Sequence, residues 1–343
     1  MSQIAISIGE TAIYWNSIII VLGILACFAM SMSLYTATGG KGASICVMTA
    51  LAVLLSLFLS RFLHWYCHED QYTGLMNCLT DFSIGSFCMP GVIFGVLLAA
   101  KLTQLIRCAD SSARLLDAAA PGLALCIALI RLSALFNSSC RSKIVVTNPL
   151  LQGLPVSSAV TDSSGSVQYL FATFFFQFIL CLVLAAALLS FYINHRRRRI
   201  KGGESRDGHV INMFLLFYGC IEIVMDSTRY DASFIHFRLL TFLNKFTGFI
   251  SFFQIVAAIF IVYLMVKYSK ISIRADALHW YHWALWVLCL GGMAAIGVCE
   301  YLVQRHGDWF IKCYSIMTLG CIAVALAVHR MYRCCCIKKS KQA

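Results

Sequence analysis

Charged residues are scarce in this chain: Asp, Glu, Lys and Arg make up 12% of its 343 residues, whereas 60% are hydrophobic. A soluble domain cannot bury that much apolar surface in one core, so the composition excludes an ordinary water-soluble fold. Because no soluble basic domain is present, the net charge of +12 does not predict nucleic-acid binding. Composition alone predicts a polytopic membrane protein.

Short motifs of common enzyme classes are also missing. The sequence contains no Walker phosphate-binding loop, no Gly-x-Gly-x-x-Gly, no Gly-x-Ser-x-Gly and no His-Glu-x-x-His. His64, Cys67 and His68 have the spacing of one helical side, but no second pair of metal ligands accompanies them. We therefore predict neither a metal site nor a cofactor.

Long apolar runs are what the sequence does contain. A membrane-spanning helix needs about 20 predominantly apolar residues. Nine segments meet this requirement, at about 14–36, 44–66, 87–106, 118–137, 168–193, 209–226, 247–268, 279–303 and 309–332. We predict an all-α, polytopic helical bundle with about nine transmembrane helices.

Basic residues orient these helices. Cytoplasmic connections carry an excess of Lys and Arg, and the densest cluster is HRRRRIKGGESR at 195–206. Placing this cluster inside and alternating from it puts the N-terminus outside and the C-terminus in the cytoplasm. Eighteen of the 27 Lys and Arg residues then lie on the inner side. The first residues lack the basic region of a cleavable signal peptide, so we expect the first apolar run to remain as a span.

Several charges lie deeper in the predicted spans than end anchors do. Arg131 is 13 residues past Ala118, about 20 Å along the fourth span. The sixth span carries four residues whose spacings of 4, 4 and 3 place them on one helical face: Tyr218, Glu222, Asp226 and Arg229. A central charge costs about 3 kcal/mol, so such residues normally pair or face a polar cavity. We predict an outward-opening cavity that contains Arg131, Glu222 and Asp226 and suits a lipid phosphate.

The stretch around Arg131 resembles the signature of bacterial prolipoprotein diacylglyceryl transferases. Asp117, Ala120, Pro121 and Arg131 reproduce the spacing of that signature, and Asn137 stands six residues after the arginine, as it does in the family. The likeness extends over about residues 6–268. Further matches are Trp15, Arg61, Tyr218-Gly219, Asp226, Arg229 and Gln254-Ile255.

Four departures from the family pattern fall near the expected site, and one of them is Ala134, which replaces an Asn of the signature. The family's His-Gly-Gly before the third span is replaced by Cys88-Met89-Pro90-Gly91. Ser139 stands where the family has an acidic residue, and Glu222 stands where it has a second cavity arginine. If Glu222 faces Arg131, the two side chains would form an ion pair.

The resemblance implies an enzyme of the bacterial plasma (inner) membrane that needs no cofactor. It would transfer the diacylglyceryl group of phosphatidylglycerol to the lipobox cysteine of prolipoprotein signal peptides, with membrane lipid as its surroundings. For the chemistry we assign Arg131 to the phosphate and Glu222 or Asp226 to the base, in place of the missing histidine, so the expected catalytic residues are Arg131, Glu222 and Asp226. The implied headgroup-binding residues are Arg131, Arg61, Arg229, Asn137 and Tyr218.

The same comparison divides the chain into three parts. Residues 1–272 form a transferase-like seven-helix domain, 273–333 a two-helix extension, and 334–343 a basic, Cys-rich cytoplasmic tail.

Two alternatives to the enzyme remain. One is a non-catalytic relative in which Arg131 and Glu222 form a structural ion pair that holds a lipid or a partner. The other is a small anion transporter, which buried charge suggests but no inverted repeat supports.

Overall fold

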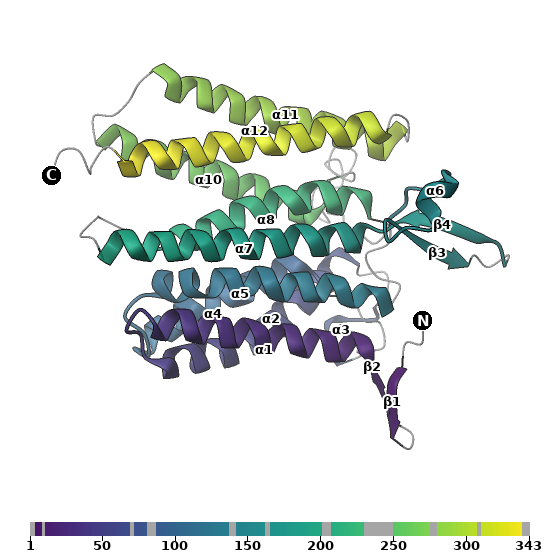
Figure 1. The fold of residues 1–343 in the computed structure, drawn as a ribbon, viewed down its shortest axis with the longest axis horizontal. Coiled ribbons are helices and arrows are strands. Elements are labelled where there is room, and N and C mark those ends of the chain that lie inside the picture. Colours follow the sequence, from purple (N-terminus) through teal and green to yellow (C-terminus); the bar gives the residue numbers. More distant parts are fainter. Residues whose placement is uncertain are drawn as a thin grey trace.

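A bundle of long helices makes up most of the structure (Figure 1). The computed structural model describes residues 4–8, 11–68, 72–80, 87–136, 142–161, 165–200, 207–229, 250–274, 280–306 and 310–337. Within this part of the chain, each of the nine predicted apolar segments forms a helix. The prediction of an all-α polytopic membrane bundle is therefore confirmed.

The nine long helices follow the apolar runs closely. They are α1 (Trp15–Thr36), α2 (Gly42–Cys67), α4 (Met89–Leu105), α5 (Ser112–Ser133), α7 (Thr173–Ile200), α8 (His209–Thr228), α10 (Phe252–Arg274), α11 (Trp280–His306) and α12 (Phe310–Ile337). All except α4 are long and apolar enough to cross a membrane alone. Helix α4 has 17 residues and is about 25 Å long, which is shorter than the hydrocarbon layer of about 30 Å.

Three helices begin five or six residues from their predicted starts: α5, α7 and α10, the last of which begins at Phe252 instead of residue 247. Helix α5 starts at Ser112, six residues before the predicted start, because the side chain of Ser111 accepts a hydrogen bond from the Arg114 amide at 3.4 Å and caps the helix. Helix α7 starts at Thr173 instead of residue 168, since the preceding residues form a strand.

Short elements lie at one end of the bundle, where Figure 1 shows two hairpins projecting. The hairpins are β1 (Ile4–Ile8) with β2 (Thr11–Tyr14) and β3 (Ser157–Thr161) with β4 (Val167–Phe171). Both are antiparallel, and Ser157 pairs with Phe171 in the second. Three short helices complete the fold: α3 (Leu75–Thr80), α6 (Pro149–Gln152) and the 3-10 helix η2 (Ala134–Phe136).

Small residues let α2 and α4 touch along their backbones. A Cβ atom added to Gly91 would lie 2.4 Å from the Cα of Ser60, and one added to Gly95 would lie 2.5 Å from the Cα of Ser56. The Ser56 hydroxyl also donates a hydrogen bond of 3.0 Å to the Val92 carbonyl. Membrane helices associate through such small-residue seams, so α4 is held by α2 despite its short length.

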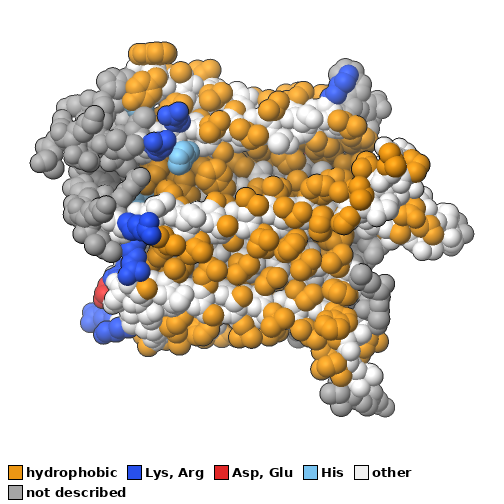
Figure 2. Space-filling view, in the orientation of Figure 1, with side chains coloured by type: hydrophobic (Ala, Val, Ile, Leu, Met, Phe, Trp, Pro, Cys, Tyr) orange, Lys and Arg blue, Asp and Glu red, His pale blue; other side chains and the backbone are white. Residues whose placement is uncertain are grey.

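The surface of the bundle separates apolar from basic residues. In Figure 2, hydrophobic side chains cover the length of the helices, whereas Lys and Arg gather at the end opposite the hairpins. This end holds the connections before α2 and after α4 and the C-terminal end of α7, with Lys41, Arg107 and Arg196. It is the end that the charge distribution predicts to be cytoplasmic.

Candidate functional site

The centre of the candidate site is a buried ion pair between α5 and α8. Arg131 lies in the last turn of α5, and its Nη2 atom pairs with the Oε1 atom of Glu222. Arg131 is 3% exposed and Glu222 is 1% exposed. Because α5 begins at Ser112, Arg131 is about 28 Å along the helix, further than the 20 Å estimated from the sequence. The protein, not the lipid, surrounds this guanidinium.

Two further side chains bind the same carboxylate. Gln177 on α7 donates from Nε2 to the Oε2 atom of Glu222 at 3.0 Å. The Nη1 atom of Arg229 lies 3.8 Å from Oε1 of Glu222 and 3.4 Å from Oδ1 of Asp226. Both oxygens of Glu222 are therefore engaged by donors from the protein. We call Arg131, Gln177, Glu222, Asp226 and Arg229 the ion-pair cluster.

The spacing of the polar residues in α8 places them on one side of the helix, as predicted. Tyr218, Glu222 and Asp226 are all buried on the side of the helix that faces the bundle. The Tyr218 ring stacks on Phe214 at 5.5 Å and meets Phe253 edge-on at 5.7 Å, and its phenol lies within electrostatic range of Arg131 and Glu222. The structure thus brings Tyr218 into the surroundings of the ion-pair cluster.

Arg61 occupies a different environment. It is buried in α2, and its Nε and Nη2 atoms donate to the carbonyl of Cys78 at 2.9 and 2.5 Å. Its guanidinium also lies 5.6 Å from the centre of the Phe87 ring. Among the described residues it makes no ion pair with Glu222 or Asp226, so these contacts fasten α3 to α2. Asn137 lies outside the described residues.

The outer ends of α2 and α4 approach the cluster from the other side. Cys67 at the end of α2 and Cys88 before α4 both lie within electrostatic range of Asp226. One turn earlier on α2, Nδ1 of His64 is 3.1 Å from the hydroxyl of Tyr72, and the His64 and His68 rings stack at 4.4 Å. No group of three or more His, Cys, Asp or Glu residues within the described chain is arranged to hold a metal ion.

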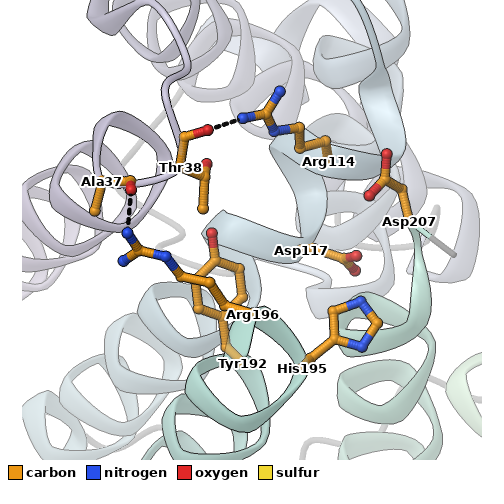
Figure 3. Close-up of a pocket in the computed structure, with 8 residues that line it drawn as sticks. All are labelled: Ala37, Thr38, Arg114, Asp117, Tyr192, His195, Arg196 and Asp207. Carbon is orange, nitrogen blue, oxygen red and sulfur yellow. Dashed lines mark hydrogen bonds between the residues drawn. The ribbon is translucent and has the colours of Figure 1, made fainter. Parts of the chain in front are cut away.

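A cavity of about 400 Å³ lies at the other end of α5 (Figure 3). It is lined by residues at the ends of α1, α5, α7 and α8, and two of them are arginines. Arg114 donates from Nη2 to the Thr38 carbonyl, and Arg196 donates from Nη2 to the Ala37 carbonyl. Both carbonyls follow the last turn of α1, where helix geometry leaves acceptors without intrahelical partners. These arginines therefore serve as caps for α1.

Asp117, which lines the same cavity, caps a different helix. Its Oδ2 atom accepts from the Gly208 amide at 2.6 Å, and its Oδ1 atom accepts from the Ile211 amide at 3.0 Å. The residue before α8 is Gly208, with φ of 93°, so α8 has no side chain of its own at the cap position. Asp117 supplies this cap from α5.

Gln177 and the partners of Asp117 were not predicted as functional residues. Gln177 had a visible signal, since it is a lone amide in the apolar run FFFQFILCLVL, and polar groups inside spans usually bind other helices. The capping role of Asp117 had no local signal, because α8 begins more than 90 residues further along the chain.

Fold and site together define the class of this protein: an all-α, multi-pass membrane protein with a buried ion-pair cluster near one end of its bundle. The model of the prolipoprotein diacylglyceryl transferase family matches residues 3–266. The chain belongs to this family. A comparison with curated proteins gives no match.

Family membership makes the protein a relative of transferases that act in lipoprotein biosynthesis on lipid and protein substrates. The matched residues end inside α10, so α11 and α12 lie beyond the family match.

Proposed function

We propose that this protein transfers the diacylglyceryl group of phosphatidylglycerol to the lipobox cysteine of prolipoproteins at a bacterial plasma membrane, from a site that faces outward. The observation that carries the proposal is the buried contact of Arg131 with Glu222, which joins a phosphate-binding group to a proton acceptor. In the reaction, the cysteine sulfur bonds to the glyceryl carbon, the bond from that carbon to the phosphate oxygen breaks, and glycerol phosphate leaves.

We assign a role to each charged side chain of the ion-pair cluster. A free thiol has a pKa of about 8.5, so it needs a base to form the thiolate. Glu222 accepts this proton and becomes neutral, which weakens its hold on Arg131. Arg131 then donates to the phosphate of the leaving glycerol phosphate, where negative charge develops. Asp226 orients Arg229 as a second donor beside the headgroup.

A reporter assay tests this function. A bacterial host without its own diacylglyceryl transferase receives a tagged prolipoprotein and this protein, and lipid attachment is measured by mass spectrometry. We expect lipidation with the wild type, and no detectable lipidation with Arg131→Ala. Because that variant leaves Glu222 without its partner, the decisive variant is the neutral pair Arg131→Gln/Glu222→Gln, which keeps hydrogen-bonding groups at both positions.

The neutral pair should accumulate in the membrane at wild-type level and lose lipidation by about 100-fold or more. Arg197→Ala, which removes an exposed arginine at the other end of the bundle, is the matched control and should retain full activity. Lipidation that persists in the neutral pair would contradict the assignment of Arg131 and Glu222.

A second candidate is a non-catalytic relative that binds a lipid or a protein partner. It is favoured by the engagement of both Glu222 oxygens with protein donors. This candidate predicts that the wild type does not lipidate the reporter. It also predicts that the neutral pair Arg131→Gln/Glu222→Gln binds phosphatidylglycerol vesicles as the wild type does, because hydrogen-bonding groups remain at both positions.

A further inference from the structure

The two-helix extension, α11 with α12, packs against the matched part of the bundle. Helices α11 and α12 lie along each other, and α12 also contacts α8 and α10 (Figure 1). The extension is mostly apolar, yet Glu300 on α11 is 2% exposed. A carboxylate buried at this depth needs polar partners. Those partners lie at the end of α8 that carries the ion-pair cluster.

The extension binds the last turn of α8 through one carbonyl. Gln304 on α11 donates from Nε2 to the Ser227 carbonyl at 3.3 Å, and Tyr314 on α12 donates its hydroxyl to the same oxygen at 3.2 Å. The last carbonyls of a helix have no intrahelical donors, so these bonds satisfy an acceptor that α8 cannot satisfy itself. Ser227 directly follows Asp226 and comes two residues before Arg229.

The same glutamine also holds the segment that returns from α5. Lys143 donates from Nζ to the Oε1 atom of Gln304 at 2.6 Å. The amide of Lys143 and the hydroxyl of Ser142 both donate to the Thr228 carbonyl, at 3.1 and 3.0 Å. The chain that follows Arg131 and the helix that carries Glu222 thus meet at one point, and Gln304 bonds to both.

Glu300 supports the junction between the last turn of α8 and the segment at Lys143. Its Oε1 atom accepts from the Nε2 atom of Gln304 at 2.8 Å, and its carboxylate lies within electrostatic range of Lys143. The amide group of Gln304 therefore has a fixed orientation, with its oxygen toward Lys143 and its nitrogen toward Ser227 and Glu300. A fixed amide orientation is what lets one side chain hold two backbone segments in register.

We propose that Gln304, Tyr314 and Glu300 of the extension are positioning residues for the ion-pair cluster, because they hold the last turn of α8 and the segment at Lys143 in one arrangement. The catalytic consequence rests on the proposed transferase function, whereas the structural consequence does not. An α-helix turns by about 100° per residue, so unwinding at Ser227 would carry Arg229 away from Glu222 and Asp226.

The ionisation of Lys143 gives this junction a pH signature. Burial lowers the pKa of the Lys143 ammonium, and the carboxylates of Glu300 on α11 and Asp226 on α8 oppose this by raising it. Removing the Glu300 charge leaves burial less opposed, so Lys143 loses its proton at a lower pH. Because the pKa is lowered, the charged form of Lys143 opposes the folded junction, and this cost is present below the lowered pKa and disappears as the pH rises to the ordinary lysine value.

Hydrogen exchange on the full chain in lipid nanodiscs tests the proposal without requiring activity. The variants are Gln304→Met, Tyr314→Phe and Glu300→Gln, and Tyr301→Phe, at an exposed position on α11, is the matched control. In Gln304→Met, amides of 142–146 and 225–229 should exchange about fivefold to tenfold faster, as the loss of one or two hydrogen bonds implies. Amides at the start of α8 should not change.

In Glu300→Gln, amides of 142–146 should exchange faster than in the wild type at neutral pH, and this difference should shrink as the pH rises and Lys143 becomes neutral in the open state too. With the purified protein in nanodiscs and a prolipoprotein substrate, Gln304→Met should lower kcat and leave KM for the prolipoprotein unchanged. If the wild type fails to lipidate, the proposed function fails, and the exchange result still decides the positioning role.

Unchanged exchange at both segments in the Gln304→Met/Tyr314→Phe double variant would overturn the proposal. Equal acceleration over all helices would overturn it too, because it would show a general stabilising role only.

Discussion

Helices α5 and α8 are joined at both ends by a buried charge, but the two junctions differ in kind. At one end, the Asp117 carboxylate accepts from the backbone amides of Gly208 and Ile211. At the other end, Arg131 pairs with the side chain of Glu222. The amides of Gly208 and Ile211 are fixed by the backbone of α8, so only the Asp117 side chain can rotate there, whereas both Arg131 and Glu222 can exchange partners by rotation. The junction at Asp117 is suited to a structural role, and the junction between Arg131 and Glu222 is suited to a chemical one.

The largest difference between the two junctions should appear when Glu222 is removed alone. Glu222→Leu removes the ion-pair partner of buried Arg131, so the free energy of unfolding should fall by about 3–5 kcal/mol. The double variant Arg131→Met/Glu222→Leu should regain most of this loss, because it removes both charges. Reversible unfolding in mixed detergent and lipid micelles measures both values. A double variant no more stable than Glu222→Leu would show that the pair is not isolated from other charges.

Gln177 gives the next largest effect. Gln177→Leu removes a hydrogen bond to a buried carboxylate, and we expect a loss of about 1.5–3 kcal/mol in the free energy of unfolding. Gln168→Leu, at an exposed position on β4, is the matched control and should stay within about 0.5 kcal/mol of the wild type. Equal stability of the two variants would mean that Gln177 does not support Glu222 energetically.

The smallest effect is expected at the structural junction. Asp117→Ala removes the cap of α8 and should cost about 1–2 kcal/mol of unfolding free energy, with an intermediate cost for Asp117→Asn. Lipidation per folded molecule should be unchanged in both variants, as measured by the reporter assay after correction for protein amount. Loss of lipidation at unchanged stability would instead place Asp117 in the chemistry.

Sequence reasoning identified the elements that depend on local pattern. Nine apolar runs predicted nine helices, since length and hydrophobicity decide whether a segment spans a membrane. The spacing of Tyr218, Glu222 and Asp226 predicted one buried face of α8, because helical periodicity is a property of neighbouring residues. The meeting of Arg131 with Glu222 followed from the cost of leaving either charge alone in the bundle.

Other features depend on contacts between distant parts of the chain. Gln304 binds Lys143 across 161 residues and Ser227 across 77, and no local pattern distinguishes it from an ordinary residue at a helix end. The partner of Arg61 could not be predicted for the same reason. An arginine near the end of a span can bind a headgroup or a carbonyl, and only the fold shows that Cys78 supplies the carbonyl.

The hairpin of α11 and α12 has a consequence for evolution and for tagging. Two antiparallel helices return the chain to the side from which it came, so their addition preserves the orientation of every helix before them (Figure 1). An ancestral chain that ended after α10 could acquire the pair without turning the rest of the protein over in the membrane. A fluorescent or enzymatic tag fused after α12 should accordingly report the same compartment as a tag inserted between α10 and α11, and the opposite compartment from a tag placed before β1.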